Sequence, residues 1–327
     1  GNGVLLQANR IDLANEGNTF KGVVRVEGAS EAILRSTETL RVQGTNLSDL
    51  NLQAQEVSLG DLGELRQLNV AALEVRQTAA LIVQGDTNLR SSKIELNNPD
   101  NDFVGLVSIQ NSGAGNAAMA VADRNDLGMQ AENLSLDAQV LGNFELQANN
   151  VELGVTQVDG ASQIELTGAL TQKRAVNLNN ASIKANQITL ANSGNQFSGN
   201  TQVQSAGTVA LGTSADLNID TTSSTGTLAL NVGGDARVEG AQVQFADSQI
   251  GGELTVSANQ IIQAGSLQVE GHAEFEAIGG QIDLQHEGNR FEGTVSASAE
   301  QTSLTTGGDM QLLNLNSRGG QLTAAGR

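Results

Sequence analysis

Apolar and polar residues alternate in short runs along nearly the whole chain. A period of two places one face of the backbone against a core and the other in solvent, which predicts β-strands. Most runs end at Gly, Asn, Ser or Asp, which supply positive φ angles or close a turn through their side chains. Clear examples are VVRV (23–26), LRVQG (40–44), LNLQA (50–54), LIVQG (81–85) and ELTVSA (253–258).

Helical patterning is scarce by comparison. The best helical candidate is residues 61–72, DLGELRQLNVAA, and this stretch also alternates at several positions. We therefore interpret it as strand or turn. The sequence predicts an all-β fold with little or no helix.

One stretch of the chain occurs four times. NQITLANSGNQFSGNTQV at 186–203 is matched by NRIDLANEGNTFKGVVRV at 9–26, SKIELNNPDNDFVGLVSI at 92–109 and GQIDLQHEGNRFEGTVSA at 280–297. Each copy has two alternating aliphatic residues, a polar turn, Asn-x-Phe-x-Gly and a second alternating run. The four phenylalanines are spaced by 83, 94 and 94 residues. Repetition at a long and nearly fixed period predicts a repeat architecture.

A parallel β-helix explains this period better than a β-sandwich does. Hairpin proteins favour tight Asn-Gly or Asp-Gly turns and provide no cause for a 94-residue register. In a parallel β-helix each coil pairs with the coils above and below it. At roughly 20 residues per coil, the chain would form on the order of 16 coils. No linker interrupts the pattern, so residues 1–327 are predicted to be a single continuous β-solenoid of about three and a half superrepeats.

The repeated polar and aromatic positions are expected to be structural. The phenylalanine would fill a wide part of the core, and the glycine would permit a corner that a Cβ would obstruct. The asparagine would turn inward and bond to corner backbone. The positions are Asn18, Phe20 and Gly22; Asn101, Phe103 and Gly105; Asn195, Phe197 and Gly199; and Asn289, Phe291 and Gly293.

Composition narrows the choice of core and of function. The chain has no Trp or Tyr and only 2% aromatics among 39% hydrophobic residues, which suits a core one side chain deep from each wall. The absence of Cys excludes disulfides, thiol catalysis and Cys-ligated metals. A net charge of −19 disfavours binding to nucleic acid or to anionic lipid.

The residues that could carry chemistry are spread along the chain. A polysaccharide-acting β-helix enzyme needs carboxylates that converge on one place of a sheet. The tightest acidic clusters are Asp100 with Asp102, and Asp123 and Asp126 with Arg124; we interpret the first as solvated turn residues. His272 and His286, the only histidines, are read as surface residues. We expect no catalytic, cofactor-binding or metal-binding site.

The motif I-x-L-x-x-x-x-N-x-F-x-G-x-V-x-V resembles the repetitive shaft of filamentous-haemagglutinin-type exoproteins, as does the segment preceding its last copy (residues 254–284). These are passengers of the two-partner secretion pathway of Gram-negative bacteria. The resemblance covers essentially the whole chain. It implies a right-handed parallel β-helix and a location outside the cell or on the outer membrane. The family's secretion domain is not recognisable, because the sole Asn-Pro pair, Asn98–Pro99, lies inside a repeat.

Three functions follow as hypotheses. The first is a structural shaft segment of a large secreted or cell-surface adhesin or filament, which presents distal binding regions. The second is a binding module in which one face of the solenoid contacts a glycan, a host surface or another partner. The third and weakest is a polysaccharide-acting enzyme. The resemblance also implies an outer-membrane transporter as a partner during export.

The two ends of the chain show no evident cap. Open β-helix ends expose unpaired backbone and favour stacking. We therefore expect the chain either to belong to a longer polypeptide or to join end to end. No secretory signal pattern is visible, and no apolar run approaches the roughly 20 residues that cross a membrane.

Overall fold

The computed structural model describes residues 3–113, 115–221 and 225–324. Every regular element in these residues is a β-strand, and they contain no helix that could cross a membrane. The chain divides into two compact units, residues 1–164 and 165–327. The single continuous domain expected from the sequence stays a prediction.

The first unit is built of short strands. They are β1 (Val4–Gln7), β2 (Arg10–Leu13), β3 (Val23–Glu27), β4 (Glu31–Arg35), β5 (Leu40–Thr45), β6 (Asp49–Gln53), β7 (Glu56–Leu59), β8 (Glu64–Leu65), β9 (Gln67–Ala71), β10 (Glu74–Gln77), β11 (Ile82–Val83), β12 (Thr87–Arg90), β13 (Lys93–Leu96), β14 (Asp102–Phe103), β15 (Val107–Gln110), β16 (Ala117–Asp123), β17 (Leu127–Ala131), β18 (Asn133–Val140), β19 (Phe144–Ala148) and most of β20 (Asn150–Leu166). Residues 61–72, the best helical candidate, contain β8 and β9.

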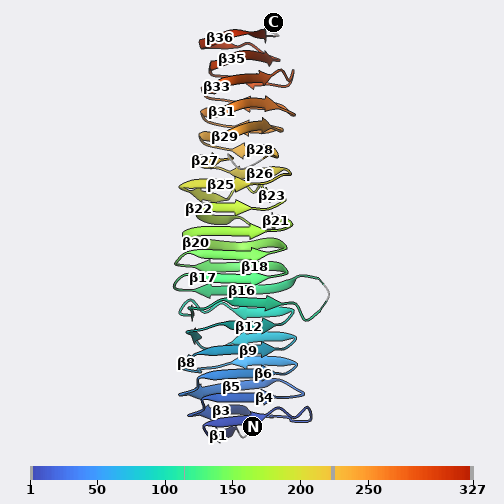
Figure 1. Cartoon of the computed structure of the whole chain (residues 1–327), viewed down its shortest axis with the longest axis vertical. Coiled ribbons are helices and arrows are strands. Elements are labelled where there is room, and N and C mark those ends of the chain that lie inside the picture. Colours follow the sequence, from blue (N-terminus) through green and yellow to red (C-terminus); the bar gives the residue numbers. More distant parts are fainter. Residues whose placement is uncertain (1–2, 114, 222–224, 325–327) are drawn as a thin grey trace. The chain divides into compact units, whose positions relative to one another are not determined.

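These strands pair in parallel with the strand one turn later. One series runs β1–β3–β5–β7–β10–β13–β16–β18, and a second runs β2–β4–β6–β9–β12–β15–β17–β19. A third, short series is β8–β11–β14. Within the unit, strands of successive turns lie one above another (Figure 1). This arrangement confirms the predicted parallel β-solenoid.

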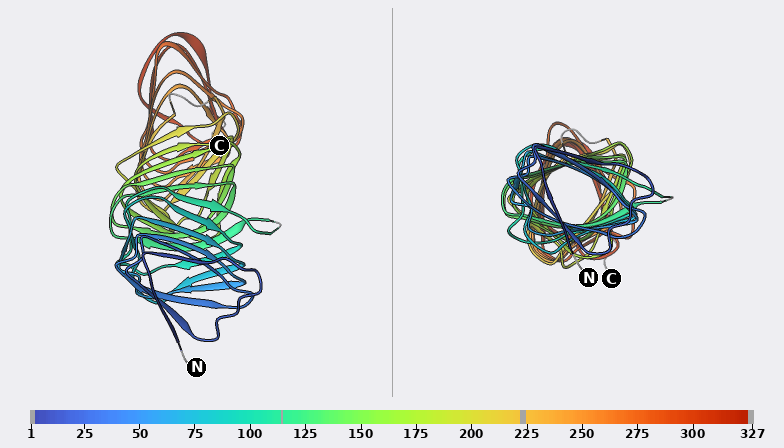
Figure 2. Two further views of the ribbon diagram at one scale, coloured as in Figure 1. Left: turned by 60° about the horizontal axis from the view of Figure 1, so that its bottom comes forward. Right: turned by 90° about the horizontal axis from the view of Figure 1, so that it is seen from below.

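The register places side chains of one kind in columns. Along the second series, Ile11, Ala32, Leu50, Leu68, Thr87 and Val107 occupy one inward column. All six are buried. Because side chains alternate between the faces of a strand, the neighbouring columns face solvent. Within the first unit, the backbone of each turn winds around a central region (Figure 2). The buried columns form the core of that unit.

The turns are shorter than the sequence analysis assumed. Asn51, Asn69 and Asn88 occupy equivalent places in successive turns and are separated by 18 and 19 residues. The part of the chain that the structure describes therefore forms about 18 turns, where the sequence predicts roughly 16. The register between Ile94 and Met119 spans a longer stretch, because this turn includes the connection between β15 and β16.

The second unit repeats the arrangement with longer strands. They are β21 (Ala169–Gln172), β22 (Val176–Lys184), β23 (Gln187–Leu190), β24 (Gln196–Ser198), β25 (Asn200–Gln204), β26 (Val209–Thr213), β27 (Leu217–Asp220), β28 (Thr227–Val232), β29 (Ala236–Phe245), β30 (Ser248–Ile250), β31 (Leu254–Gln263), β32 (Leu267–Val269), β33 (Ala273–Leu284), β34 (Arg290–Phe291), β35 (Thr294–Thr306) and β36 (Gln311–Ala324). All pairings described within this unit are parallel, and β31, β33 and β35 pair over most of their lengths.

Candidate functional site

The repeated asparagine lies inside a corner and bonds to three turns. Asn101 is fully buried, and its Nδ2 donates to the carbonyl oxygens of Leu96 and Ala122. Its Oδ1 accepts a hydrogen bond from the backbone N–H of Leu81, one turn earlier. Asn195 makes the same contacts: it accepts from Val176 N–H and donates to the carbonyl oxygens of Leu190 and Gly212. Asn289 accepts from Leu267 N–H and donates to the carbonyl oxygens of Leu284 and Thr305.

A glutamine one turn earlier completes each of these three corners. Gln77 exchanges hydrogen bonds with Asn101 in both directions, at 2.8 and 3.0 Å. Gln172 and Gln263 do the same with Asn195 and Asn289. We call each pair a Gln–Asn clasp. Sequence analysis missed the glutamines because they precede the asparagines by 24, 23 and 26 residues and lie outside the repeated stretch.

The first copy of the motif is placed differently. Asn18 is half-buried, and its side chain donates to the Leu13 carbonyl oxygen. Its corner connects β2 to β3, whereas the corner of Asn101 connects β13 to β15. Since β2 and β13 belong to different series of paired strands, the two copies lie at different corners of the solenoid. This offset accounts for the spacing of 83 residues in place of 94.

The phenylalanines of the later copies lie in the core. Phe103, Phe197 and Phe291 are buried, and Phe20 is half-buried. Phe103 stacks in register on Val83 of the previous turn. The ring of Phe291 meets that of Phe275 edge-on, with centroids 6.1 Å apart.

The motif glycines have two different physical roles. A Cβ at Gly105 would collide with the Gly85 backbone, and one at Gly293 would collide with the Gly271 carbonyl oxygen. Gly199 instead adopts a φ of 76°, which L side chains rarely adopt. Gly22 is half-buried directly before β3.

The acidic clusters are engaged with the backbone and with one arginine. Asp102 accepts a 2.7 Å hydrogen bond from the Arg124 guanidinium and a 3.0 Å bond from the Asn125 amide. The Arg124 contact lowers the pKa of Asp102 below its usual value. Asp126 accepts from the backbone N–H of Asn143 in the next turn, and the backbone N–H of Asp100 donates to Asn98.

Asp123 is the most deeply buried carboxylate of this corner. Ser36, Thr213 and Thr306 occupy the equivalent position in other turns. Like Asp123, each of these side chains accepts a hydrogen bond from the backbone N–H two residues later. The second carboxylate oxygen of Asp123 accepts a 2.8 Å bond from Phe103 N–H. Burial raises the pKa of Asp123 to about 6, although the Asn125 and Phe103 backbone donors oppose that shift.

The histidines lie at corners of the second unit. His286 occupies the position of Asn15, Asn98 and Asn192, and its Nδ1 accepts from Gly288 N–H as those side-chain oxygens accept in their own copies. The Nδ1 of His272 lies 2.7 Å from Thr294 Oγ1. The described residues contain no group of three His, Asp or Glu side chains that could hold a metal ion.

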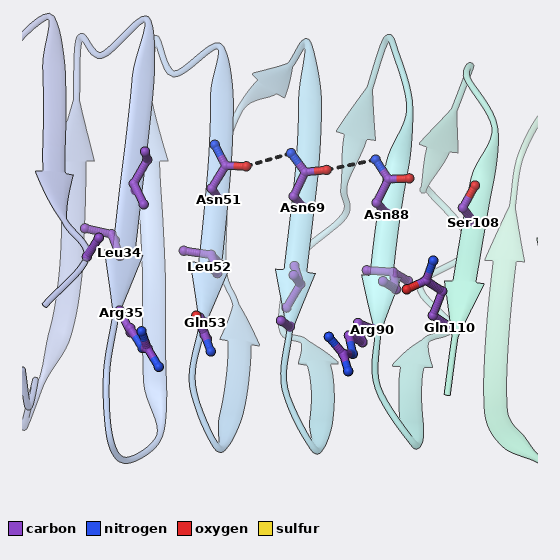
Figure 3. A pocket seen from close by; sticks show the side chains of 15 residues that line it. Leu34, Arg35, Asn51, Leu52, Gln53, Asn69, Asn88, Arg90, Ser108 and Gln110 are labelled. Carbon is purple, nitrogen blue, oxygen red and sulfur yellow. Dashed lines mark hydrogen bonds between the residues drawn. The ribbon is translucent and has the colours of Figure 1, made fainter. Parts of the chain in front are cut away.

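A depression of about 490 Å³ lies on the outer face of the first unit. Along one side of it the side-chain amides of Asn51, Asn69 and Asn88 form a ladder (Figure 3). Asn69 donates to Asn51 at 2.7 Å, and Asn88 donates to Asn69 at 2.8 Å. Sequence analysis did not single out these asparagines, because their alignment depends on the register of three separate turns.

Comparison with known proteins identifies the family of the chain. A family model described as "Repeats of unknown function (DUF5649)" matches residues 32–110, 141–204 and 233–298. No curated protein and no solved structure matches the chain. The first match contains the Gln77–Asn101 clasp, the second contains Gln172–Asn195 and the third contains Gln263–Asn289. These three matches cover more than half of the sequence, and the chain therefore belongs to the DUF5649 repeat family.

Proposed function

We propose that this chain is a structural shaft segment of a large secreted or cell-surface bacterial adhesin or filament. Its role is mechanical: it holds distal binding regions away from the cell. The resemblance of the repeats to filamentous-haemagglutinin-type shafts supports the bacterial surface location and export by two-partner secretion.

The Gln–Asn clasp is the observation that carries the proposal. Each clasp joins three successive turns through buried hydrogen bonds that leave no polar atom of the asparagine unpaired. Buried and fully satisfied polar networks make a fold rigid and specify a single arrangement. The clasp recurs at Asn101, Asn195 and Asn289, so the last three of the four motif copies each carry an internal brace.

The acidic clusters support an enzymatic role less well. The buried oxygens of Asp123 hold backbone N–H groups, and Asp102 is bonded to Arg124. Carboxylates committed to such contacts serve the corner, whereas a glycoside hydrolase needs a pair facing one sugar.

Immunogold labelling of intact producing cells tests the proposal. Antibodies raised against residues 1–327 should label the cell surface or material outside the cell, and permeabilising the cells should add little signal. Labelling that requires permeabilisation would contradict a shaft function.

A further inference from the structure

Two columns of side chains border the depression on the first unit. The register of β4, β6, β9, β12 and β15 aligns Ile33, Asn51, Asn69, Asn88 and Ser108 in one column. The same register aligns Arg35, Gln53, Ala71, Arg90 and Gln110 in the other. Both columns are on the outward face, because the residues between them, such as Leu52 and Leu89, are buried.

The hollow exists because one position in the second column is small. Ala71 stands between Gln53 and Arg90, whose long side chains project on either side of it. The asparagine ladder forms the opposite border (Figure 3). The result is a strip of amides and the two guanidinium groups of Arg35 and Arg90 beside an open space.

The charge of this strip differs from that of the chain. The sequence has 36 acidic and 17 basic residues, yet no Asp or Glu lines the depression. Arg35 bonds to Glu16 at 2.8 Å. Arg90, in contrast, has no ion-pair partner among residues 3–113, 115–221 and 225–324, and its side chain is exposed.

The ladder leaves hydrogen-bonding capacity for a ligand. A carboxamide offers two N–H donors and two oxygen lone pairs, and the bonds inside the ladder use one donor of Asn69 and one of Asn88. The amides recur at the strand spacing of about 4.8 Å. An extended polysaccharide also presents hydroxyl groups at a regular interval of similar size, so it can meet the ladder at several turns.

We propose that this depression binds a linear polysaccharide that carries carboxylates. Its hydroxyls bond to the asparagine ladder, and a carboxylate pairs with Arg90, whose planar guanidinium donates hydrogen bonds to both carboxylate oxygens at once. The site is independent of the shaft role, because a spacer needs no ligand on its side.

The overall negative charge does not prevent this binding at physiological salt. The Debye length there is about 8 Å, so distant carboxylates are largely screened while the contact with Arg90 is retained. The unpaired arginine then decides the preference for an anionic ligand.

Isothermal titration of the whole chain with oligogalacturonate tests the inference. We expect saturable binding that weakens about tenfold in Arg90→Gln, the loss of one charge-assisted contact. Ala71→Gln, which fills the hollow and leaves the ladder intact, should weaken binding to a similar extent. Arg237→Gln is the matched control, since Arg237 is an exposed strand arginine in the second unit paired with Glu239; its affinity should stay within about twofold of the unmodified chain.

Two further ligands separate the alternatives. A cello-oligosaccharide of equal length tests recognition by hydroxyls alone, and a dextran sulfate oligosaccharide, which carries sulfates and no carboxylates, tests general attraction to anions. Absence of oligogalacturonate binding, equal binding of either comparison ligand, or equal effects of Arg90→Gln and Arg237→Gln would each overturn the proposal. Circular dichroism of each variant confirms that the fold is retained.

Discussion

Gln77 and Asn101 lie one turn apart and join their side-chain amides through two reciprocal hydrogen bonds of 2.8 and 3.0 Å. Asn101 uses its remaining capacity on the backbone of three turns. One buried side chain therefore fixes the spacing and the register of a whole corner. The predictions below test this corner and the columns around it.

Replacing Asn101 by Ala should be among the most destabilising single changes in the chain. It removes the hydrogen-bond acceptor of the Leu81 N–H, one donor to each of the Leu96 and Ala122 carbonyl oxygens, and both bonds between Asn101 and the Gln77 amide in a buried corner. We expect a loss of about 3–5 kcal/mol in the free energy of unfolding, measured by urea titration. Asn18→Ala is the matched control, because Asn18 stands at the same motif position but its side chain, within the described residues, donates only to the Leu13 carbonyl oxygen. It should lower the free energy of unfolding by less than about 1 kcal/mol. Equal losses in the two variants would refute the role assigned to the clasp.

Asp123 should make stability fall as the pH rises. Its pKa of about 6 in the folded chain exceeds its ordinary value of 3.8. The folded chain therefore binds this proton more tightly than the unfolded chain does, and the contribution is full below pH 3.8 and lost as the pH rises through about 6. In thermal melts between pH 4 and pH 7, the melting temperature of Asp123→Asn should rise relative to that of the unmodified chain as the pH increases.

Asp102 provides a control of opposite sign. Its contact with Arg124 lowers its pKa, so its contribution is present at neutral pH and is lost as the pH falls through the lowered value. Asp102→Asn should therefore be less stable than the unmodified chain at pH 7, with the difference shrinking in acid. The same pH trend in both variants would contradict these assignments.

Buried threonines without partners should tolerate valine. Thr201 is fully buried, and its hydroxyl has no hydrogen-bond partner in the described part of the chain. Thr201→Val keeps the shape and removes an unsatisfied hydroxyl, so we expect a gain of about 1 kcal/mol in urea titration. Thr213→Val should instead lose about 1–2 kcal/mol, since Thr213 donates to the Asn195 oxygen and caps Ala215 N–H. If Thr201→Val lowers the free energy of unfolding as much as Thr213→Val does, the hydroxyl of Thr201 is not an unfavourable buried group.

Gly105 should not tolerate a methyl group. A Cβ there would collide with the backbone of Gly85 in the previous turn, and backbone cannot move away as a flexible side chain can. We expect Gly105→Ala to cost about 2–4 kcal/mol in thermal or urea unfolding. Gly113→Ala is the control, because nothing lies within 4 Å of its added Cβ. A neutral Gly105→Ala would show that the corner is not tightly stacked.

A whole number of turns should be removable. Residues 195–288 span five turns of the second unit, from the Asn195 corner to the Asn289 corner. Their deletion joins Gly194 to Asn289 in the same motif context, and should give a folded chain shortened by about 24 Å at the strand spacing of ~4.8 Å. Small-angle scattering and circular dichroism measure both properties. Deletion of residues 195–279 ends in the middle of a turn, and we expect it to lose cooperative unfolding.

The class of fold can be predicted from local sequence patterns alone. Alternation with period two defines which side of each strand is buried, and the strands of both units follow it. The repeated Asn-x-Phe-x-Gly marks four corners, three of which hold a buried asparagine and phenylalanine. Both signals are local, so they can be read directly from neighbouring residues.

The side-chain hydrogen bonds between different turns follow from the tertiary structure and cannot be predicted from the sequence. Gln77 and Asn101 are partners although the first lies outside the repeated motif, and the intervening length differs from clasp to clasp. The Asn51–Asn69–Asn88 ladder has the same origin, because turns of 18 and 19 residues bring these side chains into line. A shift of one residue in the register would turn them to the other face of the sheet. Strand pairing between turns therefore creates both the Gln–Asn clasps and the asparagine ladder on the outer face. Because the turns differ in length, neither is visible as a fixed spacing in the linear sequence.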